Sequence, residues 1–88
     1  MKVVFLNSFK KDLQRLTNAK LKQQIKEVII AAENAQNINK LNGIKKMKGH
    51  PFAYRIRIGD YRLGFYLDEN TIVMTRLLKR SDIYKVFP

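Results

Sequence analysis

The sequence predicts an α+β domain with two helices packed on one face of a small twisted sheet. Three observations support this prediction: a short apolar run opens the chain, two helical patterns follow it, and the second half alternates apolar and basic residues around turn sequences. The expected order is an N-terminal strand, a helical hairpin, an antiparallel three-stranded meander and a short C-terminal helical turn. A length of 88 residues predicts one domain spanning residues 1–88.

The first half of the chain contains the expected first strand and both long helices. Lys2 to Leu6 is rich in valine and predicts the strand. Asn7 and Ser8 are good N-cap residues for a first helix, which Thr17-Asn18 interrupts. The apolar positions that recur at helical spacing are Phe9, Leu13 and Leu16 in the first helix and Leu21, Ile25, Val28, Ile29 and Ala32 in the second.

The segment from residue 40 to residue 51 is expected to be the least regular part of the chain. It follows asparagine-rich residues that should end the second helix, and Gly49 and Pro51 mark a turn near its end. We expect Leu41, Ile44 and Met47 to hold this segment on the core. Its lysines, Lys45, Lys46 and Lys48, should face water.

The most informative segment runs from Tyr54 to Phe65 and predicts a β-hairpin around Gly59-Asp60. Side chains alternate between the two sides of a strand. One face should be a core surface made of Tyr54, Ile56, Ile58, Tyr61, Leu63 and Phe65. The other face should carry Arg55, Arg57 and Arg62 around the gap left by Gly64. Like charges opposite one another destabilise a strand pair by up to ~1 kcal/mol, so we interpret this face as a receptor for an anion. The alternative is a solvated strand face that guards against aggregation.

The last strand, residues 71–78, has two possible registers after the turn at residues 68–70. The preferred register, with a three-residue loop, places Val73, Thr75 and Leu77 on the core face and Arg76 beside Arg62. A two-residue loop would instead place Ile72, Met74 and Leu78 inward and bury Arg76, which is costly without a partner. Ser81 or Asp82 is then expected to cap a final helical turn that holds Ile83, Tyr84 and Phe87.

Composition limits the possible functions. Eighteen basic residues against seven acidic ones give a net charge of +11, which predicts attraction to nucleic acid or to an acidic protein, with plain solubility as the alternative. The absence of cysteine excludes disulfides and thiolate metal sites. One histidine without carboxylate neighbours predicts no metal site, and no cofactor is expected. No apolar run approaches the ~20 residues that span a bilayer, so we expect a cytoplasmic protein without membrane contact.

With these elements in place, the chain resembles the RelE/ParE superfamily of bacterial toxins, which belong to type II toxin–antitoxin modules. The resemblance covers the whole chain, and it is most specific at Tyr54–Arg62 and at the C-terminal segment Lys79–Lys85. It implies one of two activities. RelE-like members cut messenger RNA in the ribosomal A site, whereas ParE-like members inhibit DNA gyrase and lack the cleavage residues. A degenerate member that only binds its partner or RNA is a third interpretation.

The resemblance also implies site residues. The RelE-like pattern has two basic positions before the turn, an arginine after it, and a basic residue four positions before a C-terminal tyrosine. The matching catalytic candidates are Arg55, Arg57, Arg62, Arg80 and Tyr84. The residues expected to bind RNA are Lys48, His50, Arg76, Lys79 and Lys85. Lys79 stands where many relatives have histidine, and the acidic base of some relatives has no clear counterpart in residues 40–51.

These residues suit metal-free RNA cleavage, in which the 2′-OH attacks the neighbouring phosphorus. Arginines supply charge stabilisation but do not accept a proton, because their pKa exceeds about 12. Tyr84 is therefore the best candidate for proton transfer, ahead of Lys79, Lys48 and His50, and a purely structural Tyr84 is the alternative. The resemblance implies three partners: a cognate antitoxin with an acidic segment, the ribosome and messenger RNA.

Overall fold

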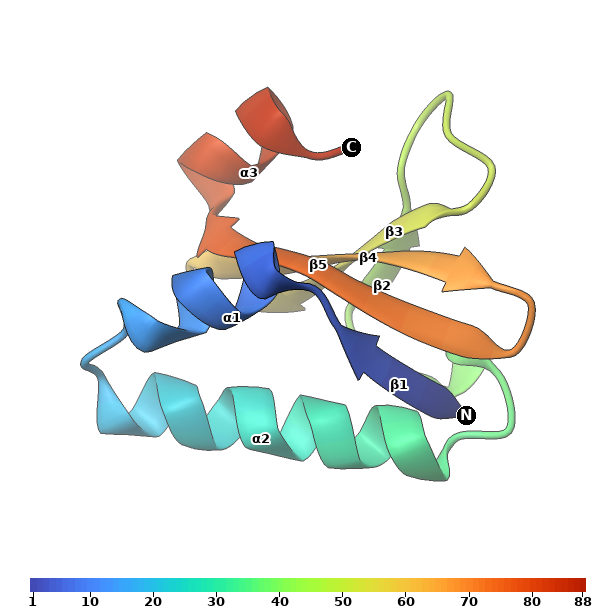
Figure 1. Ribbon diagram of the computed structural model, residues 1–88, viewed down its shortest axis with the longest axis horizontal. Coiled ribbons are helices and arrows are strands. Elements are labelled where there is room, and N and C mark those ends of the chain that lie inside the picture. Colours follow the sequence, from blue (N-terminus) through green and yellow to red (C-terminus); the bar gives the residue numbers. More distant parts are fainter.

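The computed structural model describes all 88 residues and confirms the α+β fold, with three α-helices and a five-stranded sheet (Figure 1). The elements, in chain order, are β1 (Lys2–Phe5), α1 (Asn7–Gln14), α2 (Ala19–Asn34), a 3₁₀ turn (Ile38–Lys40), β2 (Ile44–Lys46), β3 (Ala53–Ile58), β4 (Tyr61–Asp68), β5 (Thr71–Lys79) and α3 (Arg80–Val86). The sheet order is β1-β5-β4-β3-β2. Within it, β3, β4 and β5 form the expected antiparallel meander, and β1 is parallel to β5. Strand β2 lies in the segment expected to be irregular. None of the helices combines the length and apolar composition that a bilayer crossing requires.

The β3–β4 hairpin has the expected register. Ile58 faces Tyr61, Arg57 faces Arg62, and Tyr54 faces Phe65. Gly59 has φ 58°, a left-handed conformation that glycine adopts without strain and that suits the first position of a tight hairpin turn. Because this register is kept, Ile56, Ile58, Leu63 and Phe65 face the main core as expected. The rings of Tyr54 and Phe65 stack there at 5.4 Å.

Strand β5 differs from both predicted registers because it contains a β-bulge. It begins with a two-residue turn, since Asp68 pairs with Thr71, and this places Ile72 and Met74 in the core. The preferred prediction of Val73 and Thr75 as core residues is therefore wrong. The bulge then shifts the alternation by one residue, so that Leu77 faces Leu63 in the core as expected.

The same bulge changes the neighbours of the next side chains. Arg76 lies opposite Gly64, not beside Arg62 as expected, and Leu78 is the residue opposite Arg62. The expected inward position of Leu78 in the alternative register is also wrong, since Leu78 packs against a separate apolar cluster next to α3. Each predicted register therefore describes only part of the strand.

The start of each helix departs in part from expectation. Leu6 precedes α1 and makes no side-chain cap, so the expected capping by Asn7 or Ser8 is wrong. The Ser8 hydroxyl instead donates to the Thr75 carbonyl at 2.6 Å, which ties α1 to the bulge of β5. Asn18 caps α2, because its Oδ1 accepts a hydrogen bond from the Leu21 N–H at 3.0 Å. The expected cap of α3 by Ser81 or Asp82 is also wrong, because Lys79 occupies that position without a side-chain bond.

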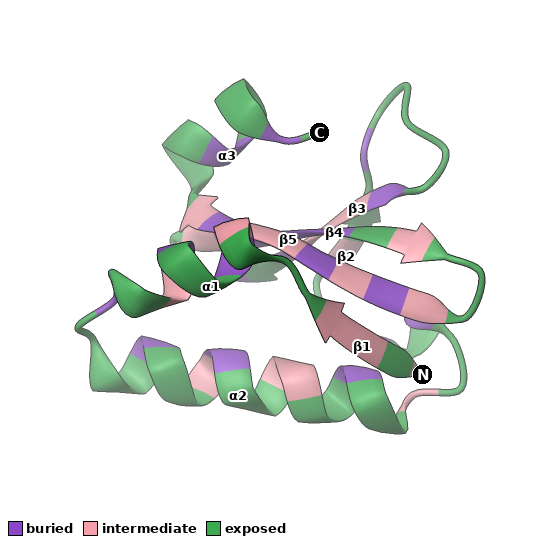
Figure 2. Cartoon of the chain, viewed as in Figure 1, coloured by how far each residue is buried: buried purple, intermediate pink, exposed green.

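Two apolar clusters lie on opposite sides of the sheet. The larger one joins α1 and α2 to the core face, and the buried stripe of α2 faces the sheet (Figure 2). The smaller one lies under α3 and consists of Met47, Ala53, Ile83 and Phe87, with Leu78 packed against it. Met47 is thus buried as expected, but against α3 and not in the main core. Helix α3 covers part of the sheet face that carries the arginines (Figure 1).

Candidate active site

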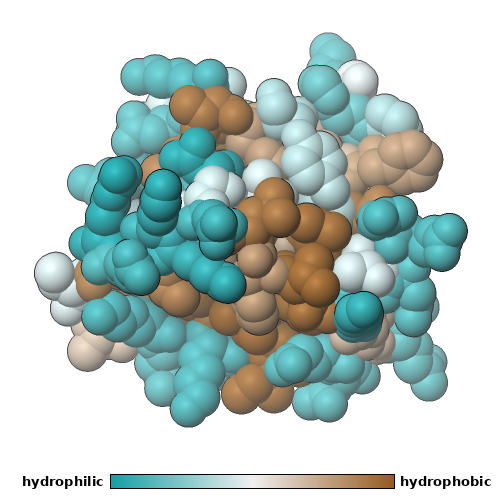
Figure 3. Space-filling view, in the orientation of Figure 1, coloured by the Kyte–Doolittle hydropathy of each residue, from teal (hydrophilic) through white to brown (hydrophobic).

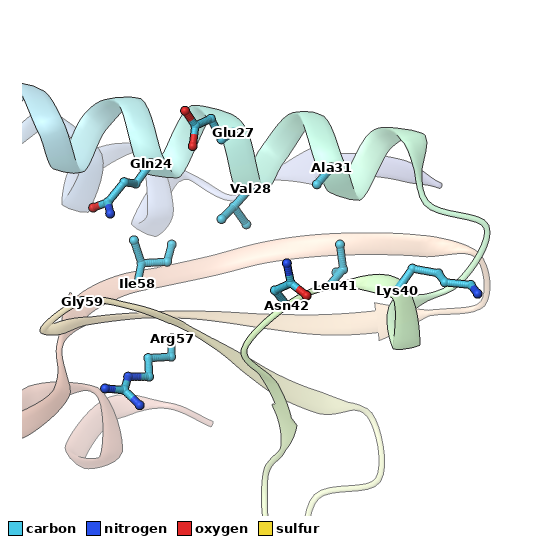
Figure 4. Close-up of a pocket in the computed structure, with 10 residues that line it drawn as sticks. All are labelled: Gln24, Glu27, Val28, Ala31, Lys40, Leu41, Asn42, Arg57, Ile58 and Gly59. Carbon is cyan, nitrogen blue, oxygen red and sulfur yellow. The ribbon is translucent and has the colours of Figure 1, made fainter.

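The sheet face opposite α2 presents the arginines of β3 and β4. Arg57 and Arg62 are direct cross-strand partners, and Arg55 lies opposite Gly64. Arg57 is exposed, and its guanidinium points away from α2 (Figure 4). It borders a hollow of about 410 Å³ between α2 and the end of β3, but its charged end lies on the other side of the strand (Figure 4). This arrangement directs the positive charge of Arg57 to the face that also carries α3.

Arg62 and Arg55 are more enclosed than Arg57. Only 7% of Arg62 is exposed, and its Nη1 donates to the carbonyls of Gly59 at 2.8 Å and Tyr61 at 2.9 Å. Arg55 donates from Nη1 to the Gly43 carbonyl at 3.0 Å. The Nε atoms of both arginines are buried and have no hydrogen-bond partner. Neither guanidinium is paired with a carboxylate, so both positive charges remain unneutralised by an ion pair.

Helix α3 contributes Arg80 and Tyr84 next to the same hairpin turn. The Arg80 N–H donates to the Asp60 carbonyl at 2.8 Å, which fixes the start of α3 on the β3–β4 turn. Residues four positions apart lie on one helix face, so Arg80 and Tyr84 are neighbours. They line an open hollow of about 640 Å³ together with Asp60, Lys79 and Ser81. Tyr84 is 53% exposed, so the alternative of a tyrosine that closes the core is wrong.

The residues expected to bind RNA are divided among three places. Lys48 and His50 are exposed in the loop between β2 and β3, where they line a hollow of about 390 Å³ with Lys46. Lys79 lies in the hollow beside α3, and the exposed Lys85 is 3.9 Å from Asp82 on the same helix. The loop and α3 rise on the same side of the sheet, with the arginine strands between them (Figure 1).

Arg76 is held away from this group by Asp12 of α1. Its Nε donates to Asp12 Oδ2 at 2.8 Å and its Nη2 to Oδ1 at 3.3 Å. The hydrogen bond and the charge of Asp12 raise the pKa of Arg76 above its ordinary value, against the opposing effect of burial. The structure therefore places Arg76 in an internal ion pair.

Sequence patterns do not single out two aspartates, Asp60 and Asp12, whose positions in the structure are informative. The sequence pattern identifies Asp60 only as a turn residue, whereas in the structure it lines the hollow beside Arg80 and Tyr84. Asp12 is 4% exposed and also accepts a hydrogen bond from the Leu77 N–H at 2.9 Å. Its position three residues after Phe9 and four before Leu16 puts an acid on the apolar stripe of α1. That position was a signal of a buried carboxylate with a specific partner.

Comparison with known proteins gives consistent results. Residues 3–84 match the family described as ParE toxin of type II toxin-antitoxin system. Toxin RelE3 from Methanocaldococcus jannaschii is 40% identical over 89 residues that cover 100% of both chains. A chain in the crystal structure of a RelB-RelE antitoxin-toxin complex from Methanococcus jannaschii is 38% identical, with a TM-score of 0.81 and coverage of 97% of this chain and 99% of that chain. A chain in the archaeal RelE-RelB complex from Pyrococcus horikoshii OT3 shares the fold, with a TM-score of 0.73, 23% identity, and coverage of 90% and 93%.

These relatives correct one detail of the resemblance. Toxin RelE3 comes from an archaeon, so the description of the superfamily as bacterial is wrong. The full-length match at 40% identity and the family match over residues 3–84 agree on the class of protein. The chain belongs to the RelE/ParE family of toxins from type II toxin–antitoxin modules, and its sequence and fold are RelE-like.

Proposed function

We propose that this toxin is a ribosome-dependent messenger RNA endonuclease that inhibits translation in the cytoplasm. The observation that carries the proposal is that Arg57 and Arg62 of the β3–β4 hairpin lie close in the chain to the same turn on which the Arg80 N–H bond fixes α3, with Arg80 and Tyr84 on its first turns. None of these arginines is neutralised by an ion pair. A cluster of this kind suits a phosphodiester, because guanidinium groups bind phosphate oxygens in a planar, bidentate geometry.

The cleavage step divides between charge stabilisation and proton transfer. The 2′-oxygen forms a bond to phosphorus as the bond from phosphorus to the 5′-oxygen breaks, and extra negative charge develops on the phosphorane oxygens. Arg57 and Arg80 are exposed and contact these oxygens, whereas Arg62 and Arg55 add positive charge from below the surface. The departing 5′-oxygen takes a proton from the Lys79 ammonium, which lines the same hollow as Tyr84. Tyr84, as its phenolate, takes the proton of the 2′-OH. Its exposure and its place in the hollow beside Arg80 support this role.

A ribosome-programmed cleavage assay tests the arginine roles. Loss of one charge-stabilising donor typically lowers the rate by about 10²–10³-fold, so Arg57→Ala and Arg80→Ala should each fall in this range. Arg15→Ala is the matched control, because Arg15 is exposed on the segment after α1, outside the cluster. If Arg57→Ala and Arg80→Ala cleave as fast as Arg15→Ala, the assignment is wrong.

The proton acceptor is tested by comparing Tyr84→Phe with Asp60→Asn. Tyr84→Phe keeps the ring and removes the hydroxyl, and Asp60→Asn keeps the backbone carbonyl that accepts from the Arg80 N–H. A loss of cleavage in Tyr84→Phe alone supports Tyr84. A loss in Asp60→Asn alone would transfer the role to the carboxylate that lines the same hollow.

We also propose an antitoxin partner with an acidic segment that covers the arginine face. Chains of similar fold are found in antitoxin-toxin complexes. A net charge of +11 favours an acidic segment that folds as it binds.

Apolar side chains also gather at the surface over the end of β1 and the adjoining part of α2, where Phe5, Leu6 and Ile30 are exposed (Figure 3). An exposed apolar patch of this kind is typical of a surface that binds another protein.

Gyrase inhibition is the second candidate, because the matching family is described by its ParE toxins. Brief expression in cells separates the two functions. Rapid arrest of translation, with transcripts cut in phase with codons, supports the endonuclease. Filamentation with DNA damage, together with inhibition of purified gyrase, would support the alternative.

A further inference from the structure

The space above Gly64 is filled by the ring of Phe87, the residue that follows α3. A Cβ atom at position 64 would lie 2.6 Å from Cδ2, 2.7 Å from Cε2 and 2.9 Å from Cγ of this ring. Gly64 is not among the glycines with positive φ, so its backbone does not require glycine. The requirement comes from the ring, which reaches the strand only because position 64 has no side chain.

Phe87 is enclosed on its other sides as well. Only 3% of it is exposed, and it belongs to the small cluster with Met47, Ala53 and Ile83. Its ring centroid lies 5.1 Å from that of Tyr66. Its N–H donates to the Ile83 carbonyl at 2.8 Å, so the ring is tied directly to the last turn of α3.

Helix α3 is held at its start by the Arg80 N–H bond to the Asp60 carbonyl, and at its end it depends on the contact of Phe87 with Gly64. It has seven residues and no side-chain cap. Helices of this length are not stable alone in water, so tertiary packing must hold it in place. The side chains that pack α3 against the sheet are Ile83 and, just after the helix, Phe87. A rotation or lift of the helix that removes Phe87 from Gly64 would also move Arg80 and Tyr84, because Arg80, Tyr84 and Phe87 belong to one short segment.

We propose that Phe87 is a positioning residue whose ring, seated on Gly64, sets the rotation and height of α3 and thereby places Arg80 and Tyr84 against the arginine strands. The catalytic part of this inference rests on the proposed endonuclease function. The contact between Phe87 and Gly64 can be tested without it.

The test is a double-mutant cycle with Gly64→Ala, Phe87→Leu and both together. Gly64→Ala forces the ring outward, and a displacement of about 1 Å in catalytic groups can lower kcat by ~10²-fold. We expect kcat to fall by about 10- to 100-fold after correction for the folded fraction, with KM for programmed ribosomes changed less than about two-fold. The smaller leucine leaves room for the new methyl group, so the double variant should cleave faster than Gly64→Ala alone.

Val86→Ala is the matched control, because Val86 belongs to the same helix and is exposed. It should leave kcat and KM unchanged. If Gly64→Ala does not fold, Phe87→Leu alone tests the positioning role of Phe87, since it removes ring contacts without adding bulk.

Hydrogen exchange of the α3 amides gives a readout that does not depend on cleavage. Exchange should be faster in Gly64→Ala than in the wild type. It should be slower in the double variant than in Gly64→Ala, and in Val86→Ala it should equal that of the wild type. If the wild type does not cleave RNA but the exchange pattern holds, the proposed function fails and the positioning contact stands. The positioning role is overturned if Gly64→Ala leaves both α3 exchange and kcat as in the wild type, or if the double variant shows only the sum of the single effects.

Discussion

Replacement of Asp12 by alanine should lower the free energy of unfolding by about 2–3 kcal/mol. The carboxylate is nearly inaccessible and accepts hydrogen bonds from Arg76 and from the Leu77 N–H. These bonds join α1 to β5 immediately after the bulge. The substitution therefore removes a connection between two elements that lie far apart in the sequence.

The magnitude follows from the individual bonds. The Leu77 N–H would be left buried without an acceptor, which costs about 1–3 kcal/mol. The side chain of Arg76 is 27% exposed, so it can reach water, and the ion pair contributes no more than about 1 kcal/mol after solvent screening. Asp12→Asn keeps a carbonyl oxygen for the Leu77 N–H, so it should lose only about 1 kcal/mol.

Urea unfolding followed by circular dichroism measures both variants. The midpoint should shift with an unchanged slope, and a loss of 2–3 kcal/mol corresponds to a melting temperature about 10–20 °C lower for a domain of this size. Asp82→Ala is the matched control, because Asp82 is an exposed aspartate with only a 3.9 Å contact to Lys85. Its effect should stay within about 0.5 kcal/mol.

Two results would refute this reasoning. The first is an Asp12→Ala protein as stable as Asp82→Ala, which would mean that β5 finds other acceptors. The second is an Asn variant less stable than the Ala variant, which would mean that the Leu77 N–H bond is not the main contribution.

Three further outcomes are expected. Asn18→Ala removes the side-chain acceptor for the Leu21 N–H and should lower stability by ~1 kcal/mol in the same urea assay. Glu69→Gly should raise stability by about 0.5–1 kcal/mol, because Glu69 has φ 55° in the β4–β5 turn and glycine adopts this conformation without strain; a loss of stability would contradict this. The affinity for single-stranded RNA should fall with added salt, and Lys48→Ala should reduce the slope of log K against log salt by about 0.7 in fluorescence titrations; an unchanged slope would exclude Lys48 from phosphate contact.

The hairpin could be predicted from sequence because its signals are local. Gly59-Asp60 and the alternating residues beside it determine the turn, the register and the facing of the arginines. Strand β5 could not be predicted in the same way. Its bulge is stabilised by Ser8 and Asp12 of α1, which bond to residues 64 to 67 positions away in the chain.

The candidate site was predicted unevenly for a similar reason. The spacing of Arg80 and Tyr84 places both on one helix face, and this depends on neighbouring residues only. Arg62 is buried although the strand alternation predicts an open basic face, and the ring that fills the gap at Gly64 comes from the far end of α3. Sequence patterns identify charged side chains, but their accessibility is decided by contacts between distant segments.

The parallel pairing of β1 with β5 sets the order in which the molecule can be completed during its synthesis. Lys2 lies beside Thr71 and Phe5 beside Met74, so β1, the first strand to be synthesised, can pair only after β5, the last strand. Contacts between segments so far apart require a long loop to close first, which slows folding. In the nascent chain β1 therefore has no partner strand until β5 has been synthesised, and Arg80 and Tyr84 follow β5 in the chain. The residues that we propose cleave messenger RNA therefore join the fold only after all five strands have been synthesised.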